Sequence, residues 1–294
     1  MNIAVFGNIN LDIIALTERE KKSSEEQRIL NYQLMLGGTA ANTAIQLKRL
    51  RNSVFLNGAV GNDIFANVLI EKLSVAGIST ENVDILEKEK TGLCFATVKE
   101  KTGYRFLQTF RGANESFRPK KENWRTVNHF AGMNTFQIKE IESFMNYTSV
   151  NTYTPGGIVS FEQPEEIVAM SKRFSVIFFN EKEWNNVNSA GKISSDIVVV
   201  TKGNNGAEIV GGPQHKGYDL KVKDTTGAGD AFCAGFLHLY AKKAPLIDCL
   251  AFGNVLGSLT IKEYGAQGTF SYKDIINFTK SNEPKLVKYF EGAE

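Results

Sequence analysis

Four short segments of the chain are apolar at consecutive positions rather than at every second one. They are IAVF (3–6), VFLNGAV (54–60), VIFF (176–179) and DIVVVT (196–201). A strand with one face in water alternates apolar and polar residues, so continuous runs predict strands that are covered on both faces. Helices on both sides of a parallel sheet provide such cover. This feature restricts the chain to folds built around a buried, mostly parallel sheet.

Helical patterns separate these apolar segments. They are TAANTAIQLKRL (39–50), FANVLIEKLSVAG (65–77), which closes on Gly77, and a stretch from Asp230 to about Lys242. Glycine is the usual residue just beyond the end of a helix. Alternating strands and helices predict an α/β fold, a doubly wound, mostly parallel sheet flanked by helices. We expect residues 1–294 to form a single domain of this kind.

Two regions have a different pattern. RILNYQLML (28–36) places apolar residues at every second position, and LCFATVKEKTGYRFLQTF (93–110) predicts two strands around the turn EKTG. Both are typical of half-exposed antiparallel strands. We predict a small β-strand lid over about 13–36 and 91–111, which covers a site or pairs with another subunit. If the lid pairs with another subunit, the protein is a homodimer through the lid.

Composition excludes several function classes. The chain is 42% apolar, and its 34 basic and 32 acidic residues give a net charge of +2, which argues for neither nucleic acid nor an anionic membrane. No window holds about 18 uninterrupted apolar residues, and the first residues lack a secretory pattern, so we expect a cytoplasmic protein. The three cysteines lack CxxC spacing and are expected to be buried and unpaired. The three histidines lie far apart in the sequence, which argues against a histidine-based metal site.

The segment DTTGAGDAF (224–232) carries the strongest chemical signal. Gly227, Ala228 and Gly229 leave successive backbone N–H groups unobstructed where a helix begins, and such a site favours a transferring phosphate. Asp230 lies in the first helical turn, where the helix dipole predicts a low pKa. A weak base suffices for phosphoryl transfer, whose transition state is loose. The alternative is a tight turn before a helix.

The segment has no P-loop beside it. The chain contains neither GxxxxGK[ST] nor GxGxxG, so a nucleotide must be held by another arrangement. VVVTKGNNGAEIV (198–210) predicts a strand, a turn and a second strand. Lys202, in the turn, would contact a phosphate or remain solvated. In NEKEW (180–184), Asn180 and Glu183 would hold Mg²⁺ through waters.

Two further polar segments adjoin predicted strands. GGTAANTA (37–44) offers a glycine turn, Thr39 as a helix cap and Asn42 one turn inside the helix. GNINLD (7–12) follows the first strand, at the carboxyl end where open α/β sheets bind ligands. Asp12 suits a pair of ligand hydroxyls, because a carboxylate accepts two hydrogen bonds. The alternative for GGTAANTA is a glycine turn with a helix cap, and the alternative for Asp12 is an ordinary turn residue.

Together these segments resemble the ribokinase-like PfkB family of carbohydrate and nucleoside kinases. The resemblance covers essentially the whole chain, and also includes GAVGND (58–63), RGAN (111–114) and DTTGAGDAFCAGF (224–236). It implies an ATP-dependent kinase that phosphorylates a hydroxymethyl group of a small molecule. Within the family, GGTAANTAIQLKRL and the pairing of FRGAN with a short lid look most like archaeal-type nucleoside kinases.

The resemblance also implies a role for each matching residue. Asp230 would be the general base, and the anion hole would be formed by Gly227, Ala228 and Gly229. Substrate would be bound by Asn10, Asp12, Gly38, Asn42 and Arg111. ATP would lie along Asn180, Thr201, Lys202, Gly203, Gly206 and Asn254. The implied cofactors are ATP and Mg²⁺, the latter at Asn180 and Glu183, and in some members a monovalent cation such as K⁺ at the positions of Asp224 and Thr226.

Several acceptors are compatible with these motifs. We expect a nucleoside 5′-kinase. In it Phe106 and Phe110 would either offer an apolar face to the base or pack within the lid hairpin. A ribokinase or other sugar kinase is an alternative, and so is a phosphofructokinase-like sugar-phosphate kinase, for which Arg105 and Arg111 would clamp the phosphate. A non-catalytic binding protein is a further class, against which the intact DTTGAGD segment argues. FEQPEE (161–166) and GAQGT (265–269) depart from common family patterns and leave the acceptor and the cation open.

Overall fold

The computed structural model describes residues 1–17, 28–99, 105–145, 149–262 and 264–290. Nine strands form the larger sheet, in the order β13 (Gln214–His215), β12 (Ala207–Ile209), β11 (Ile197–Thr201), β10 (Val176–Asn180), β9 (Val150–Thr154), β8 (Val127–Ala131), β1 (Asn2–Gly7), β4 (Ser53–Gly61) and β5 (Val83–Leu86). Neighbours from β11 to β5 run parallel. Strand β12 pairs antiparallel with β11 on one side and with β13 on the other. The predicted doubly wound α/β core is confirmed.

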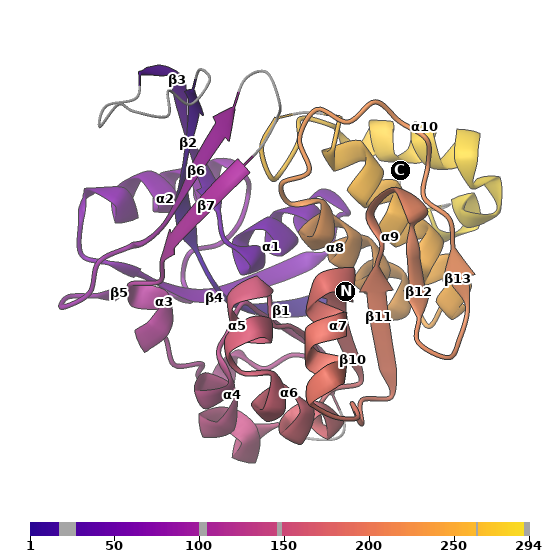
Figure 1. The fold of residues 1–294 in the computed structure, drawn as a ribbon, viewed down its shortest axis with the longest axis horizontal. Coiled ribbons are helices and arrows are strands. Elements are labelled where there is room, and N and C mark those ends of the chain that lie inside the picture. The colour runs from indigo at the N-terminus through magenta and orange to yellow at the C-terminus, as the bar shows by residue number, and fades with distance from the viewer. Residues whose placement is uncertain (18–27, 100–104, 146–148, 263, 291–294) are drawn as a thin grey trace.

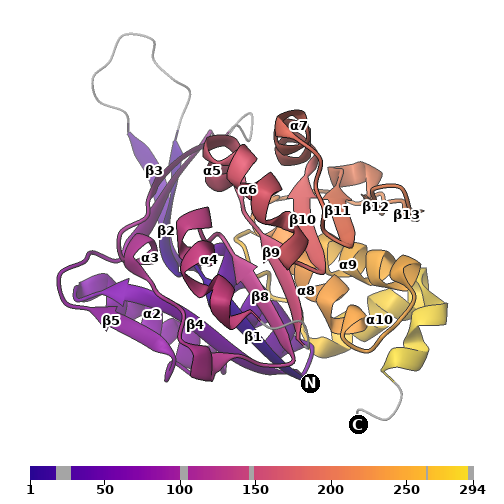
Figure 2. The same cartoon turned by 90° about the horizontal axis from the view of Figure 1, so that it is seen from below.

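Helices cover both faces of this sheet (Figures 1 and 2). One face packs against α1 (Thr39–Arg49), α2 (Ile64–Val75), α8 (Ala228–Tyr240), α9 (Leu246–Thr260) and α10 (Tyr272–Asn282). The other packs against α3 (Ala113–Ser116), α4 (Thr135–Ile141), α5 (Gly157–Glu162), α6 (Pro164–Met170) and α7 (Glu181–Ala190). Along β1, Ile3 and Val5 enter the first core, and Ala4 and Phe6 enter the second. Burial on both faces explains the continuous apolar runs.

The strands and helices predicted from periodicity are present. The four apolar runs form β1, β4, β10 and β11, and the three helical patterns form α1, α2 and α8. Gly77 follows α2 with a left-handed φ of 73°. Strands β8 and β9 were not predicted, because polar residues interrupt them. These residues bond across the two strands instead: Asn128 Nδ2 lies 3.2 Å from Asn151 Oδ1.

A second sheet stands beside the first (Figure 1). Its order is β3 (Ile29–Gly37), β2 (Asn10–Thr17), β6 (Gly92–Lys99) and β7 (Arg105–Phe110). The two outer pairs are antiparallel, but the central pair, β2 with β6, is parallel, which the prediction did not include. The turn EKTG lies outside the described residues. The strands match the predicted lid, whereas the single-domain organisation stays a prediction.

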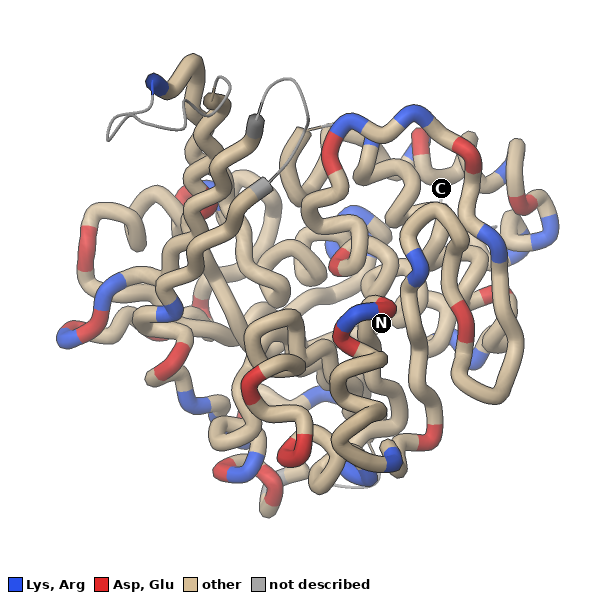
Figure 3. Tube along the Cα trace, viewed as in Figure 1, with Lys and Arg blue, Asp and Glu red and all other residues tan. Residues whose placement is uncertain are grey.

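The surface carries both signs of charge. Lysine and arginine alternate with aspartate and glutamate around the trace in Figure 3, in keeping with the net charge of +2. A membrane-crossing helix is absent from the described ranges, since none of their helices is both long and apolar enough.

Two buried histidines make the fold sensitive to acid. His129 on β8 and His238 on α8 are almost fully buried, and desolvation lowers the pKa of each to about 3. In an unfolded chain histidine titrates near pH 6.5. Below that pH the unfolded state therefore binds protons that the folded state does not, and stability is lost as the pH falls.

We expect each histidine to contribute a loss of about 2 kcal/mol in unfolding free energy between pH 7 and pH 5. The variant His238→Gln should lose correspondingly less stability than the wild type over this interval. Urea denaturation at the two pH values measures both proteins, and comparing them cancels the other titrating groups. The same pH dependence in both would contradict the assignment.

Candidate active site

A cavity of about 460 Å³ lies between the two sheets, at the carboxyl edge of the larger one. Thr154, Asn180 and Thr201, the last residues of β9, β10 and β11, line it from the larger sheet. The second sheet contributes Asp12, Ile14, Cys94, Ala96 and Leu107, and the start of α8 with its preceding loop contributes Thr225, Thr226, Gly227, Gly229 and Asp230. Residues far apart in the sequence therefore meet at the carboxyl edge of the larger sheet, where the polar segment GNINLD (7–12) predicted a ligand-binding site.

The start of α8 requires a glycine. Gly227 precedes the helix with a left-handed φ of 72°, and a Cβ there would lie 2.1 Å from the carbonyl oxygen of Ala266. A Cβ on Gly229 would meet nothing within 4 Å, so this turn is open to the cavity as far as the described residues show. The 13-residue helix thus presents its N-terminus to the cavity, which favours an anion there.

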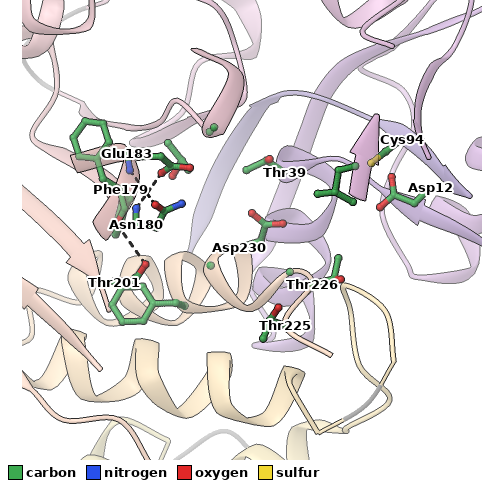
Figure 4. Close-up of a pocket in the computed structure, with 18 of the residues that line it drawn as sticks. Asp12, Thr39, Cys94, Phe179, Asn180, Glu183, Thr201, Thr225, Thr226 and Asp230 are labelled. Carbon is green, nitrogen blue, oxygen red and sulfur yellow. Dashed lines mark hydrogen bonds between the residues drawn. The ribbon is translucent and has the colours of Figure 1, made fainter. Parts of the chain in front are cut away.

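The carboxylate of Asp230 points into the cavity (Figure 4). Its Oδ2 accepts a hydrogen bond from Asn42 Nδ2 at 2.8 Å. Burial raises the pKa of Asp230 to about 7; the Asn42 bond opposes this shift, and the charges of Asp12 and Glu183 add to it. The low pKa predicted from the helix dipole is wrong, because desolvation outweighs the stabilisation that the helix start provides.

Helix α1 begins beside the same cavity. Gly38 is its N-cap, with a φ of 91°, and a Cβ there would lie 2.4 Å from the carbonyl oxygen of Asn8. The prediction that Thr39 caps the helix is wrong: no side-chain hydrogen bond caps α1 in the described structure. Thr39 is the first helical residue and lines the cavity (Figure 4).

Asn10 and Arg111 are held by other protein groups and are not among the described residues that line the cavity. Asn10 Oδ1 accepts from Asn114 Nδ2 at 2.8 Å. Arg111 pairs with Glu115 and donates to the carbonyl of Gly132 at 3.1 Å. Asn114 was missed as a site residue, although RGAN was recognised as a motif. Its Oδ1 accepts from the backbone of the residue before Asn10, so it anchors the start of β2.

The apolar wall of the cavity differs from the predicted one. Leu107 pairs with Ala96 and both line the cavity. Successive side chains alternate across a strand, so Phe106 and Phe110 lie on the opposite face, 55% and 52% exposed. The prediction that they face a bound base is wrong. Cys94, expected to be buried, is partly exposed on the cavity wall, and the Arg105 side chain lies outside the described residues.

A second cavity, of about 150 Å³, adjoins the first. Both are lined by Thr201, Thr225, Gly229 and Phe232, so they meet at the first turn of α8. Besides Thr201, three more residues predicted at the ATP site line the second cavity, namely Gly203, Gly206 and Asn254. Lys202 instead pairs with Glu208, with 2.7 Å between Nζ and Oε2.

A third cavity, of about 410 Å³, continues past Ile14 along the second sheet. It shares Ile14 with the first cavity and Thr225 with both others. Its other lining residues are Leu16, Asn31, Tyr32, Gln33, Val98, Val222, Lys223, Asp224 and Tyr264. The hollow that begins at Asp230 therefore extends well beyond the surroundings of this residue.

Asn180 and Glu183 form a capping box at the start of α7. Asn180 Oδ1 accepts from the Glu183 backbone at 3.0 Å, and Glu183 Oε2 accepts from the Asn180 backbone at 2.9 Å. Burial raises the pKa of Glu183, whose side chain lines the cavity (Figure 4). Among the described residues, no three His, Cys, Asp or Glu side chains gather as metal ligands.

Asp224 fixes the loop that precedes α8. Its Oδ1 accepts from the backbone and the hydroxyl of Thr226, at 2.9 and 2.7 Å. Its Oδ2 accepts from the backbone of Gly265 at 2.9 Å. The two residues predicted at a monovalent-cation site therefore lie together, and they tie this loop to the segment that follows α9.

Sequence comparison identifies the family. The model of the pfkB family carbohydrate kinase matches residues 1–155 and 159–272. An ATP-dependent ribose-1-phosphate kinase of Halopiger xanaduensis is 28% identical, over 89% of this chain and 92% of that protein. A ribokinase of Staphylococcus aureus is 26% identical, over 94% and 98%.

Solved structures share the fold. A nucleoside kinase of Methanocaldococcus jannaschii has a TM-score of 0.85 at 22% identity, over 96% of this chain and 98% of that one. A ribokinase of Thermotoga maritima has a TM-score of 0.77 at 22% identity, over 95% and 99%. The chain belongs to the pfkB family of carbohydrate kinases, and the ATP-dependent kinase activity predicted from its sequence follows from that membership.

Proposed function

We propose that the protein transfers a phosphoryl group from ATP to the 5′-hydroxymethyl group of a nucleoside, with Asp230 as the general base. The position of Asp230 carries this proposal. It lies in the acceptor cavity one residue from Gly229, where that cavity meets the second one. A pKa near 7 suits a base at neutral pH, because it combines basicity with a large deprotonated fraction.

The transfer would proceed in one displacement. The acceptor hydroxyl would donate a hydrogen bond to Asp230 while its oxygen faces the γ-phosphorus of ATP. As the new O–P bond forms and the bond to ADP breaks, Asp230 takes the hydroxyl proton. Backbone N–H groups of Gly227, Ala228 and Gly229 would stabilise the charge on the transferred group. Asp12 would accept hydrogen bonds from the sugar hydroxyls.

The site fits a magnesium ion held through water. Glu183 Oε2 is used in the capping box, but its second carboxylate oxygen belongs to a buried side chain on the cavity wall. Mg²⁺ keeps much of its hydration and takes few protein ligands, and when bound it would neutralise phosphate charge. Asn180 would contribute by holding Glu183 in place. A K⁺ ion beside Asp224 and Thr226 stays a prediction.

The third cavity supports a nucleoside over a free pentose. Leu16, Val98 and Tyr264 line it with apolar surface, and Asn31 and Gln33 belong to the same lining. A flat base with a polar edge suits such surroundings. A free pentose bound near Asp12 would leave this space to water.

A sugar phosphate is a second candidate acceptor, favoured by the name of the Halopiger relative. A phosphate on the acceptor calls for paired cations. Across the described lining of the first and third cavities, however, Lys223 is the one lysine or arginine, and it adjoins Asp224. Arg111 is already paired with Glu115. The described side chains thus favour an uncharged acceptor.

A product screen tests the acceptor class. Incubation with ATP and Mg²⁺ should give a kcat/KM for the best nucleoside at least about tenfold above those for ribose, ribose 1-phosphate, fructose and fructose 6-phosphate, because a pocket contact is worth about that factor. Mass spectrometry identifies the phosphorylated product. The variant Leu16→Trp, which fills the third cavity, should lower nucleoside turnover and spare ribose. A preference for ribose or ribose 1-phosphate in the wild type would overturn the acceptor assignment.

Removing the base tests the mechanism. Asp230→Asn should lower kcat by roughly 10²- to 10⁴-fold, the usual contribution of a general base, while circular dichroism shows the fold retained. In the wild type, kcat/KM should rise with pH through about 7, since the base acts deprotonated. Undiminished turnover in Asp230→Asn would remove this residue from the mechanism.

We also propose a homodimer through the outer face of the second sheet, the face turned away from the cavity. Exposed apolar side chains gather there, namely Leu34, Phe95, Phe106 and Phe110. The trace of this sheet is mostly uncharged in Figure 3. Contiguous apolar patches of this kind mark interfaces.

Light scattering at micromolar concentration should give twice the monomer mass. Phe106→Asp should give a monomer, because it buries a charge in the proposed interface. Phe136→Asp is the matched control: this phenylalanine is 61% exposed but lies on α4, and its variant should stay dimeric. A monomeric wild type would end the proposal.

A further inference from the structure

Residues 265–268, which follow α9, contact both parts of the proposed catalytic apparatus. The carbonyl of Ala266 lies against Gly227 at the start of α8. The side chain of Gln267 reaches toward the end of β3 and the start of α1. Its Nε2 donates to the carbonyl of Leu36 on β3 at 2.7 Å and to Asn42 Oδ1 on α1 at 3.4 Å. One short segment thus touches the anion-binding turn and the partner of Asp230.

This segment is itself held firmly by α1. The Gln267 carbonyl accepts from Gln46 Nε2 at 2.9 Å and from Arg49 Nη1 at 2.6 Å. Arg49 also donates to the Gly268 carbonyl at 3.2 Å, and its guanidinium lies 4.4 Å from the ring centre of Phe270. These contacts fix the backbone from which the Gln267 side chain extends.

The amide of Asn42 has two orientations, related by a half-turn, and only one of them serves Asp230. In the observed orientation Nδ2 donates to Asp230. The reverse would set Asn42 Oδ1 against a carboxylate, and would set its Nδ2 against the donor Nε2 of Gln267. At 3.4 Å the Gln267 contact is longer than a strong hydrogen bond. Its effect therefore lies in selecting the orientation.

We propose that Gln267 is a positioning residue, which fixes the Asn42 amide in the orientation that donates to Asp230. The proposal rests on the proposed role of Asp230 as the base. Asn42 then stabilises the ionised carboxylate of Asp230 by donating to its Oδ2, and the Oδ1 of Asp230 stays available to the acceptor hydroxyl. When the Gln267 donor is removed, Asn42 turns more freely and Asp230 stays protonated to a higher pH.

The other titratable groups around Asp230 remain in place when Gln267 changes. They are Asp12 on β2, Glu183 on α7 and Cys233 on α8. His129 on β8 lies behind them, with Nε2 3.5 Å from the sulfur of Cys233. None of them has a hydrogen bond to the Gln267 side chain among the described contacts. A change in the titration of Asp230 would thus report on Asn42.

The pH profile of kcat/KM tests the proposal, with whichever acceptor the wild type phosphorylates. Gln267→Met keeps the length of the side chain and removes its donor. It should move the acid limb of the profile, where kcat/KM rises as Asp230 loses its proton, to a pH about half to one unit higher. A shift of this size corresponds to the partial loss of a charge-assisted hydrogen bond. Gln46→Met is the matched control, because it loosens the same backbone without touching the Asn42 amide. Its limb should stay within about 0.2 pH units of the wild type.

A double variant separates positioning from general loosening. Asn42→Ala alone should move the limb by about one to two pH units. If Gln267 acts through Asn42, adding Gln267→Met to Asn42→Ala moves it no further. Additive shifts, or an equal shift in Gln46→Met, would overturn the proposal.

A second readout does not depend on turnover. In protein labelled with ¹³C at aspartate carboxyls, the signal missing from Asp230→Asn identifies Asp230, and its titration should move upward in Gln267→Met. Gln267→Leu, which lacks the donor and adds no charge, should move it in the same direction and replaces Gln267→Met if that variant does not fold. A titration that moves in Asn42→Ala but not in the Gln267 variants would refute the positioning role. Full activity in Asp230→Asn would instead refute the base, so the two failures are distinct.

Discussion

The site depends on a single hydrogen bond between two helices, from Asn42 Nδ2 on α1 to Asp230 Oδ2 on α8. A desolvated carboxylate without a partner is costly, so this contact favours the observed placement of α8 against α1, with which it packs. Helix α1 follows directly from β3 of the second sheet. The bond therefore also ties the wall formed by the second sheet to the helix that carries the proposed base.

Three acids line the first cavity, and their charges affect its chemistry. Asp12, Glu183 and Asp230 reach it from three different elements, and the described lining of this cavity includes no lysine or arginine. Burial and mutual repulsion raise the pKa of Asp230 to about 7. The same negative surroundings disfavour an anionic acceptor and favour hydroxyl groups as donors. Burial, with the nearby acids adding to it, thus accounts for the raised pKa on which the proposed base and the proposed uncharged acceptor depend.

The sequence predicted what local pattern encodes and missed what depends on neighbours. Continuous apolar runs located β1 and β10, but β8 and β9 escaped because their buried polar residues are satisfied across strands, as in the 2.9 Å contact of His129 with Thr152. The helix start at Asp230 was predicted, whereas its pKa depends on burial by distant elements. Alternation predicted β7, yet it did not show that Phe106 faces away from the cavity, which depends on how the sheet packs.

The register of the second sheet decides which of its faces becomes the cavity wall. Side chains alternate, so a slip of one residue in β2 would turn Asp12 and Ile14 outward and bring Ile13 inward. Asn114 prevents this slip at the beginning of the strand, because it bonds both the Asn10 side chain and the backbone before it. Asn10 is predicted to bind substrate, but its observed contact sets the register that brings Asp12 to the cavity. An asparagine at this position therefore serves the site even without touching a ligand.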